Sequence, residues 1–143
     1  MVYNSNSTEE TKIIGFDLAK KLDTGAIKSK FIALRGEMGV GKTAFTAGFC
    51  EYFGAGGVKS PTYTIVLEYV ARDGRRIFHF DMYRIGSEDD LLSIGYDELI
   101  ASGAYSIVEW SENIDGFIPD DAVYVTIERV DGDDQKRRII IEE

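Results

Sequence analysis

The sequence predicts a single α/β domain, built around a mixed sheet with helices on both faces and antiparallel hairpins. Two observations lead to this prediction. A glycine-rich loop, GEMGVGKT at 36–43, lies between a short apolar segment and an amphipathic one. Further along, two pairs of β-branched runs meet across short turn signals. A chain of 143 residues matches the usual length of one domain, so we expect one domain over 1–143.

The first half of the chain predicts a helix, a strand, a loop and a second helix. Ser7 followed by Glu10 is a capping-box pattern, and apolar residues recur behind it at helical spacing, which predicts a helix over 8–23. FIALR at 31–35 is a short apolar run between polar flanks, typical of a buried strand. Behind the loop, aromatic residues share one face of a predicted helix over 43–53.

Two hairpins are predicted in the second half. The run at 62–72 meets its partner across Asp73-Gly74, which is a two-residue hairpin signal. The runs at 123–130 and 137–143 predict a closing hairpin across DGDD.

One helical pattern and one strand separate the hairpins. Residues 87–101 look helical, with Ser87 as a cap and an interruption near Gly95. YSIVEW at 105–110 predicts another buried strand. Strands that alternate with helices favour a sheet covered on both faces.

Composition narrows the functional classes. Net charge is −9, with 16 basic and 25 acidic residues, so the chain alone is a poor binder of nucleic acid and would reach RNA only indirectly, through partner proteins. A lone cysteine, Cys50, rules out an internal disulfide, and we expect it to be a core side chain. The N-terminus is polar and acidic, and no apolar run reaches the roughly 18 residues of a membrane span. These features favour a cytoplasmic protein without membrane association.

The loop GEMGVGKT fits the Walker A pattern G-x-x-x-x-G-K-[S/T]. Its backbone N–H groups and the N-terminus of the following helix would hold phosphate oxygens. Lys42 would reach the β- and γ-phosphates, and Thr43 would place its hydroxyl on Mg²⁺. The candidate nucleotide-binding residues are Glu37, Met38, Gly39, Val40, Gly41, Lys42, Thr43, Ala44 and Thr62.

Two acids end predicted strands. Asp81 ends IFHFD and Glu109 ends YSIVE. If both strands run parallel to 31–35, both carboxylates point at the phosphate site, because ligands of open α/β sheets lie outside the carboxyl ends of the strands. One acid would hold a metal-bound water and the other would orient the attacking water or complete the metal shell, and the residues alone leave that division open. Each acid could instead cap the following turn.

The segment KSPTYT at 59–64 offers hydroxyl groups between the loop and the first hairpin. Such a segment can sense a γ-phosphate, as switch segments do, or can simply solvate its own turn.

Three further residues have weaker claims. His79 is the only histidine, and its alternation with Phe78 and Phe80 favours a hydrogen-bonded structural role. Arg84 is expected to pair with an acid and brace the turn after Asp81 rather than to stabilise a transition state. Trp110 is expected in the core, near the nucleotide or against a partner.

Four segments in order, GEMGVGKTAF, SPTYT, HFDMYR and VEW, resemble the TsaE family, formerly YjeE. This family comprises small bacterial ATPases required for the threonylcarbamoyladenosine (t6A) modification of tRNA. The resemblance covers nearly the whole chain. It implies a P-loop NTPase-like three-layer fold, ATP with Mg²⁺, and binding to the TsaD–TsaB pair, whose repeated turnover ATP binding and hydrolysis would support.

The resemblance also implies roles for single residues. Lys42 matches the phosphate-binding lysine and Thr43 the magnesium-ligating hydroxyl. Asp81 matches the acid implicated in hydrolysis, and Glu109 the acid implicated in metal binding. Thr62 is the candidate in SPTYT for sensing the γ-phosphate or the metal. Catalytic candidates are therefore Asp81, Glu109 and Lys42, and metal candidates are Thr43 and Glu109.

Other functions stay open at this point. A small-molecule kinase on this scaffold needs an acceptor site and usually an Arg-bearing lid, for which 143 residues leave little room. A regulatory GTPase usually carries an N-K-x-D loop, which is absent here. A nucleotide-gated binding module with little chemistry differs from an ATPase only in whether hydrolysis matters.

Overall fold

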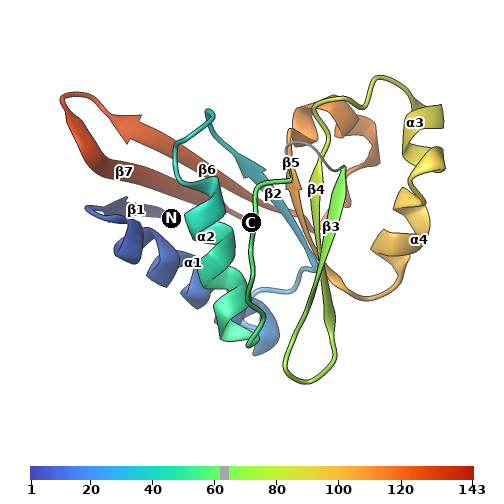
Figure 1. Ribbon diagram of the computed structural model, residues 1–143, viewed down its shortest axis with the longest axis horizontal. Helices are drawn as coiled ribbons and strands as arrows, with labels where there is room; N and C mark the ends of the chain where they lie inside the picture. Colours follow the sequence, from blue (N-terminus) through green and yellow to red (C-terminus); the bar gives the residue numbers. More distant parts are fainter. Residues whose placement is uncertain (62–64) are drawn as a thin grey trace.

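The computed structural model describes residues 1–61 and 65–143, and their fold has three layers (Figure 1). The central layer is a seven-stranded sheet in the order β1-β7-β6-β2-β5-β4-β3. Its strands are β1 Val2–Ser5, β2 Phe31–Arg35, β3 Val66–Val70, β4 Arg76–Asp81, β5 Tyr105–Glu109, β6 Val123–Val130 and β7 Asp133–Glu142. The helices are α1 Thr8–Asp23, α2 Lys42–Tyr52, α3 Glu88–Ser93, α4 Tyr96–Ala101 and the 3₁₀ helix η1 Ser111–Phe117.

The sheet is mixed, as predicted. Four neighbouring strands, β6, β2, β5 and β4, run parallel, and antiparallel partners extend the sheet at both ends: β3 beside β4, and β7 followed by β1 beside β6. The carboxyl ends of the parallel strands therefore meet at one edge of the sheet. This edge carries the loop between β2 and α2 and the last residues of β4 and β5.

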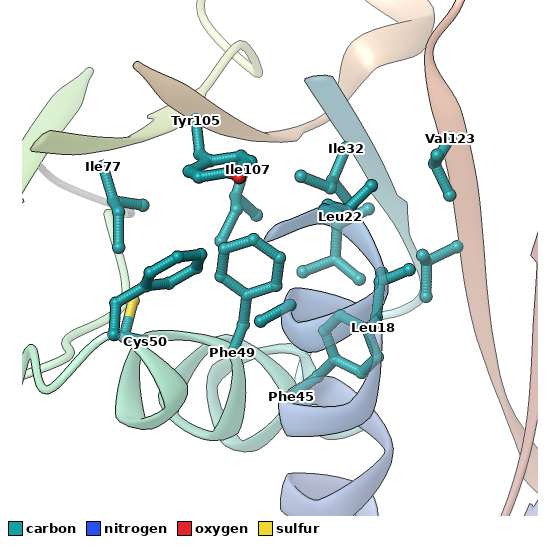
Figure 2. Close-up of a cluster of buried hydrophobic side chains, with 14 of the residues drawn as sticks. Leu18, Leu22, Ile32, Phe45, Phe49, Cys50, Ile77, Tyr105, Ile107 and Val123 are labelled. Atoms are coloured by element: carbon teal, nitrogen blue, oxygen red, sulfur yellow. The ribbon is translucent and has the colours of Figure 1, made fainter. Parts of the chain in front are cut away.

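Each face of the sheet has its own apolar cluster, and helices cover both faces, as predicted (Figure 1). On one face, Phe45 and Phe49 of α2 and Leu18 of α1 point toward Ile32 and Val123 of the sheet, as Figure 2 shows. The other face packs against α3 and α4. Its buried members are Phe31, Ala33, Phe78, Phe80, Met82, Ile85, Leu91, Tyr96, Val108, Ile114 and Ala122.

Helices α1 and α2 cross with their backbones in contact. A Cβ atom added to Gly48 would lie 1.9 Å from the carbonyl oxygen of Lys12, and one added to Gly15 would lie 2.2 Å from that of Phe45. Only glycine fits at these two positions, so the close crossing depends on both.

The helix boundaries agree closely with the prediction. The Ser7 side chain accepts a hydrogen bond from the N–H of Glu10 and caps α1, as the capping-box pattern predicts. The segment predicted at 87–101 is divided at Gly95, whose φ of +71° ends α3 and begins α4.

The first hairpin is confirmed, but its predicted two-residue turn is wrong. The N–H of Ala71 donates to the carbonyl of Arg75, which leaves the three residues between them in the turn. A two-residue type I′ turn needs a positive φ at both central positions, and here Gly74 has one (φ +90°) while Asp73 does not.

The chain ends form more strand than predicted. Strand β1 lies at the edge of the sheet and pairs with β7, and β7 itself begins at Asp133 rather than 137. The four residues VYNS did not predict a strand, and they form one by pairing with β7. The helix η1 was likewise not predicted. Within the described residues, no helix combines the length and the apolarity needed to traverse a bilayer.

Candidate functional site

A cavity of about 560 Å³ opens at the carboxyl edge of the parallel strands. Its volume lies within the range typical of sites for small molecules and cofactors. The residues that line it come from the glycine-rich loop and the start of α2, from the ends of β4 and β5 with the turns that follow them, and from the irregular segment at 55–61. They are Met38, Gly39, Gly41, Lys42, Thr43, Ser60, Asp81, Tyr83, Arg84, Glu109 and Trp110.

The glycine-rich loop presents unpaired backbone donors to this cavity. Its N–H groups at Gly39, Gly41, Lys42, Thr43 and Ala44 donate to no acceptor among residues 1–61 and 65–143. The last three also belong to the first turn of α2, where the helix dipole adds positive potential. Backbone donors of this kind, gathered at a helix N-terminus, are suited to bind phosphate oxygens.

Two arginines of the closing hairpin hold the loop from outside, where Figure 1 shows the loop beside β6 and β7. Nε of Arg137 donates to the carbonyl of Val40 at 2.7 Å. Arg129 donates to the carbonyl of Met38 at 3.3 Å and lies 3.9 Å from the carboxylate of Glu37. The carbonyl groups of Met38 and Val40 thereby face the hairpin and not the cavity.

Asp81 and Glu109 are neighbours across β4 and β5. They are register partners, and Glu109 is also the register partner of Leu34, one residue before the end of β2. The strands run parallel, as the prediction required, and both carboxyl groups line the cavity.

The two acids differ in environment. Burial raises the pKa of Asp81, and the nearby charge of Glu109 acts in the same direction. Burial would also raise the pKa of Glu109, but the hydrogen bond from His79 and the charges of His79 and Lys42 outweigh it, so this pKa lies below its ordinary value. Glu109 is therefore an ionised carboxylate, whereas Asp81 holds a proton more readily than an ordinary aspartate does.

Glu109 is held on both of its oxygens. Nζ of Lys42 lies 3.4 Å from Oε1, and Nε2 of His79 lies 2.6 Å from Oε2. The ionised carboxylate can only accept, so Nε2 of His79 is the donor. His79 is fully buried, which confirms the predicted hydrogen-bonded histidine.

Aromatic residues and one arginine form the outer rim of the cavity. The rings of Tyr83 and Trp110 are 4.9 Å apart, and Nζ of Lys42 lies 6.0 Å from the Trp110 ring. Trp110 is 40% exposed, so it is not a core residue, and its φ of +59° is unusual for a bulky side chain. The prediction that Arg84 braces the turn through an acid is wrong, because within the described part of the chain Arg84 makes no ion pair.

The structure brings most of the predicted site residues together. Glu37 and Ala44 do not line the cavity, and the side chain of Val40 is buried in the core. Thr62 lies outside the described residues. Those that do line it are Met38, Gly39, Gly41, Lys42, Thr43, Asp81 and Glu109.

A family model described as "Threonylcarbamoyl adenosine biosynthesis protein TsaE" matches residues 5–139. The chain belongs to the TsaE family. Its place in t6A biosynthesis, a process of tRNA modification, follows from this membership.

Named relatives agree with this family. The tRNA threonylcarbamoyladenosine biosynthesis protein TsaE of Bacillus subtilis (strain 168) is 38% identical over 130 residues, which are 90% of this chain and 77% of that protein. The protein of the same name from Haemophilus influenzae is 37% identical over 105 residues, 73% of this chain and 66% of that protein. The crystal structure of YdiB from Bacillus subtilis superposes with a TM-score of 0.72 at 30% identity, covering 97% of this chain and 82% of that one.

Sequence reasoning missed some contributors to this TsaE-type site. Arg129 and Arg137 reach the loop across the fold, and their positions in the sequence carry no signal of that contact. Tyr69 was not singled out either, although it stands next to His79 in space.

Proposed function

We propose that the chain is a Mg²⁺-dependent ATPase of t6A biosynthesis, which binds and hydrolyses ATP to support turnover of the TsaD–TsaB complex. The observation that carries the proposal is the convergence of Lys42, Asp81 and Glu109 on one cavity beside the glycine-rich loop. Family membership supports the part that concerns tRNA modification. The net charge of −9 supports contact with tRNA only through the partner proteins.

The loop and Lys42 account for binding of the triphosphate. The unpaired N–H groups at the start of α2 can donate to phosphate oxygens without losing any bond within the described protein. The side chain of Lys42 is 11% exposed, and its positive charge is balanced by the carboxylate of Glu109. When phosphate arrives, its charge competes with Glu109 for the same ammonium group.

The residues present fit a magnesium ion. Mg²⁺ prefers oxygen ligands and is usually held by one or two carboxylates together with substrate phosphates. Thr43 supplies a hydroxyl and Glu109 an ionised carboxylate in the same cavity. Magnesium, when bound there, offsets the negative charge on the phosphate oxygens.

Asp81 is placed to assist the attacking water. A water oxygen forms a bond to the γ-phosphorus as the bond to the ADP oxygen breaks, and the water proton passes to a base. A carboxylate with a raised pKa is better suited to accept that proton than one held firmly ionised. Lys42 and the loop N–H groups stabilise the charge that develops on the phosphate oxygens.

Turnover by the isolated chain is expected to be slow. No glutamine lies among the described lining residues, and Arg84, the one arginine there, sits exposed on the rim. The partners would complete the site.

The test is to measure phosphate release from ATP and Mg²⁺ by the chain alone and with TsaD and TsaB. We expect slow turnover alone, a changed rate with the partners, and no turnover by Lys42→Ala. Absence of hydrolysis under both conditions would overturn the proposal. Transfer of the labelled γ-phosphate to a small molecule would instead establish a kinase.

A further inference from the structure

A series of polar contacts leads away from the cavity at Glu109: the contacts that join Glu109, His79 and Tyr69 are buried, and those between Tyr69 and Lys59 are partly buried. His79 donates to Glu109 through Nε2, and its Nδ1 lies 3.2 Å from the hydroxyl of Tyr69. That hydroxyl accepts from the N–H of Lys59 at 3.2 Å and lies 3.1 Å from the carbonyl oxygen of the same residue. These contacts link β5, β4 and β3 to the backbone of Lys59.

The strand registers explain why these side chains meet. Tyr69 pairs with Ile77 on β4, so His79 is its diagonal neighbour on the same face of the sheet. His79 is paired in turn with Ile107, one side-chain step from Glu109 on that face. His79 is 0% exposed, Tyr69 7% and Glu109 6%, so the contacts are shielded from water and correspondingly strong.

The last residue in this series of contacts, Lys59, lies beside the cavity wall. Lys59 directly precedes Ser60, which lines the same cavity as Glu109. Residues 55–61 form no helix or strand, so the Tyr69 hydroxyl fixes backbone that no ladder of hydrogen bonds holds. Two parts of the cavity wall are therefore joined through the protein interior.

We propose that Tyr69 and His79 are positioning residues, which couple the side chain of Glu109 to the backbone at Lys59–Ser60. A change in how Glu109 is held, as when Lys42 turns to phosphate, is passed to this segment. The effect on hydrolysis rests on the proposed function, whereas the coupling itself does not. If Tyr69 and His79 only satisfied one another's hydrogen bonds as buried polar groups, replacing them would lower stability. A change at Glu109 would then leave the backbone at Lys59 unaffected.

The first test measures amide hydrogen exchange at Lys59 by NMR in the chain of 143 residues without nucleotide. Tyr69→Phe keeps the ring and removes the acceptor, so exchange at Lys59 should accelerate. Glu109→Gln and His79→Gln do not touch Lys59, and we expect both to accelerate the same amide. The control Tyr52→Phe removes a hydroxyl bonded to Asp23 and should leave Lys59 unchanged. Protection at Lys59 equal to wild type in Glu109→Gln would overturn the coupling.

Global stability is measured for every variant, so that a general loosening is recognised by faster exchange in the core strand β2 as well. Acceleration confined to Lys59 and its neighbours supports the coupling, whereas uniform acceleration across β2 counts against it.

The second test is a double-mutant cycle on ATP hydrolysis. Loss of a residue that orients a metal-binding side chain typically lowers activity about 10–100-fold. Tyr69→Phe should therefore lower kcat by about tenfold with little change in KM. In the Glu109→Gln background the same change should have no further effect. Additive effects would overturn the positioning role. A wild type that hydrolyses no ATP would defeat the proposed function, while the exchange experiment would still decide the coupling.

Discussion

Asp81 and Glu109 are register partners on neighbouring parallel strands, yet their pKa values shift in opposite directions. Burial acts on both carboxyl groups. Only Glu109 has a histidine and a lysine on its two oxygens, whereas the oxygen Oδ1 of Asp81 accepts from the backbone N–H of Tyr83. Two acids in such different environments often divide the roles of base and charged ligand.

Replacement of Asp81 by asparagine should separate hydrolysis from binding. Asparagine keeps the size of the side chain but cannot take a proton, so kcat for ATP should fall by about 10²–10⁴-fold, the usual contribution of a general base. The Kd for ATP should stay close to that of the wild type, because the loop and Lys42 are untouched. Phosphate release and calorimetric titration measure the two quantities. An unaltered rate would remove Asp81 from the mechanism.

Replacement of Arg137 by glutamine should weaken ATP binding without touching the cavity. The guanidinium of Arg137 holds the carbonyl of Val40, and a hydrogen bond to a charged group contributes about 1.5–3 kcal/mol. If part of this energy orders the loop, the Kd for ATP should rise about tenfold, which corresponds to about 1.4 kcal/mol.

Arg138→Gln is the matched control for this prediction. Arg138 is exposed on the next position of β7, and its side chain makes no hydrogen bond or ion pair within the described residues. Both variants lose one positive charge, so equal losses of affinity would mean that charge alone, and not the contact with Val40, acts on the nucleotide.

The sequence was sufficient to predict the sheet edge that carries the site. FIALR and YSIVE are apolar runs that end in a phosphate loop and an acid, and the parallel direction on which the prediction depended is present between β2 and β5. The position of Asp81 was predicted in the same way, because it ends the strand IFHFD. Local pattern works here because the chemistry stands at the ends of strands, whose direction the connecting helices largely determine.

The contacts that support the site were beyond such reasoning. Arg137 and Val40 are 97 residues apart in sequence, and the bond between them exists only after β7 has paired with β6. The hydroxyl of Tyr69 on β3 contacts the backbone of Lys59, which lies in the irregular segment 55–61. Neither contact leaves a periodic or compositional trace.

The thiol of Cys50 should be unreactive in the folded protein. Cys50 is fully buried on α2, and burial raises the pKa of its thiol to about 12, so almost no thiolate is present at pH 8. Reaction with a disulfide reagent should therefore be slow in buffer and fast in denaturant. Cys50→Ala supplies the blank, since this is the only cysteine. Stoichiometric labelling of the native chain within seconds would contradict the packing of α2 against the sheet.

Replacement of Gly48 by alanine should destabilise the protein, although alanine is usually the better residue in a helix by about 0.5–1 kcal/mol. The added methyl group would lie 1.9 Å from the carbonyl oxygen of Lys12, which is backbone and cannot turn aside. Helices α1 and α2 must then move apart and loosen the core between them, at a cost of about 1–3 kcal/mol, as for other overpacked sites.

Urea denaturation of Gly48→Ala against Gly116→Ala measures this cost. Gly116 lies in η1, and a Cβ atom added there would meet open space. The free energy of unfolding of the Gly116→Ala variant should therefore stay within about 0.5 kcal/mol of that of the wild type. A denaturation midpoint for Gly48→Ala at or above that of the control would show that the helices separate at no cost. The close backbone crossing would then not be what fixes α2, and with it the phosphate loop at its N-terminus.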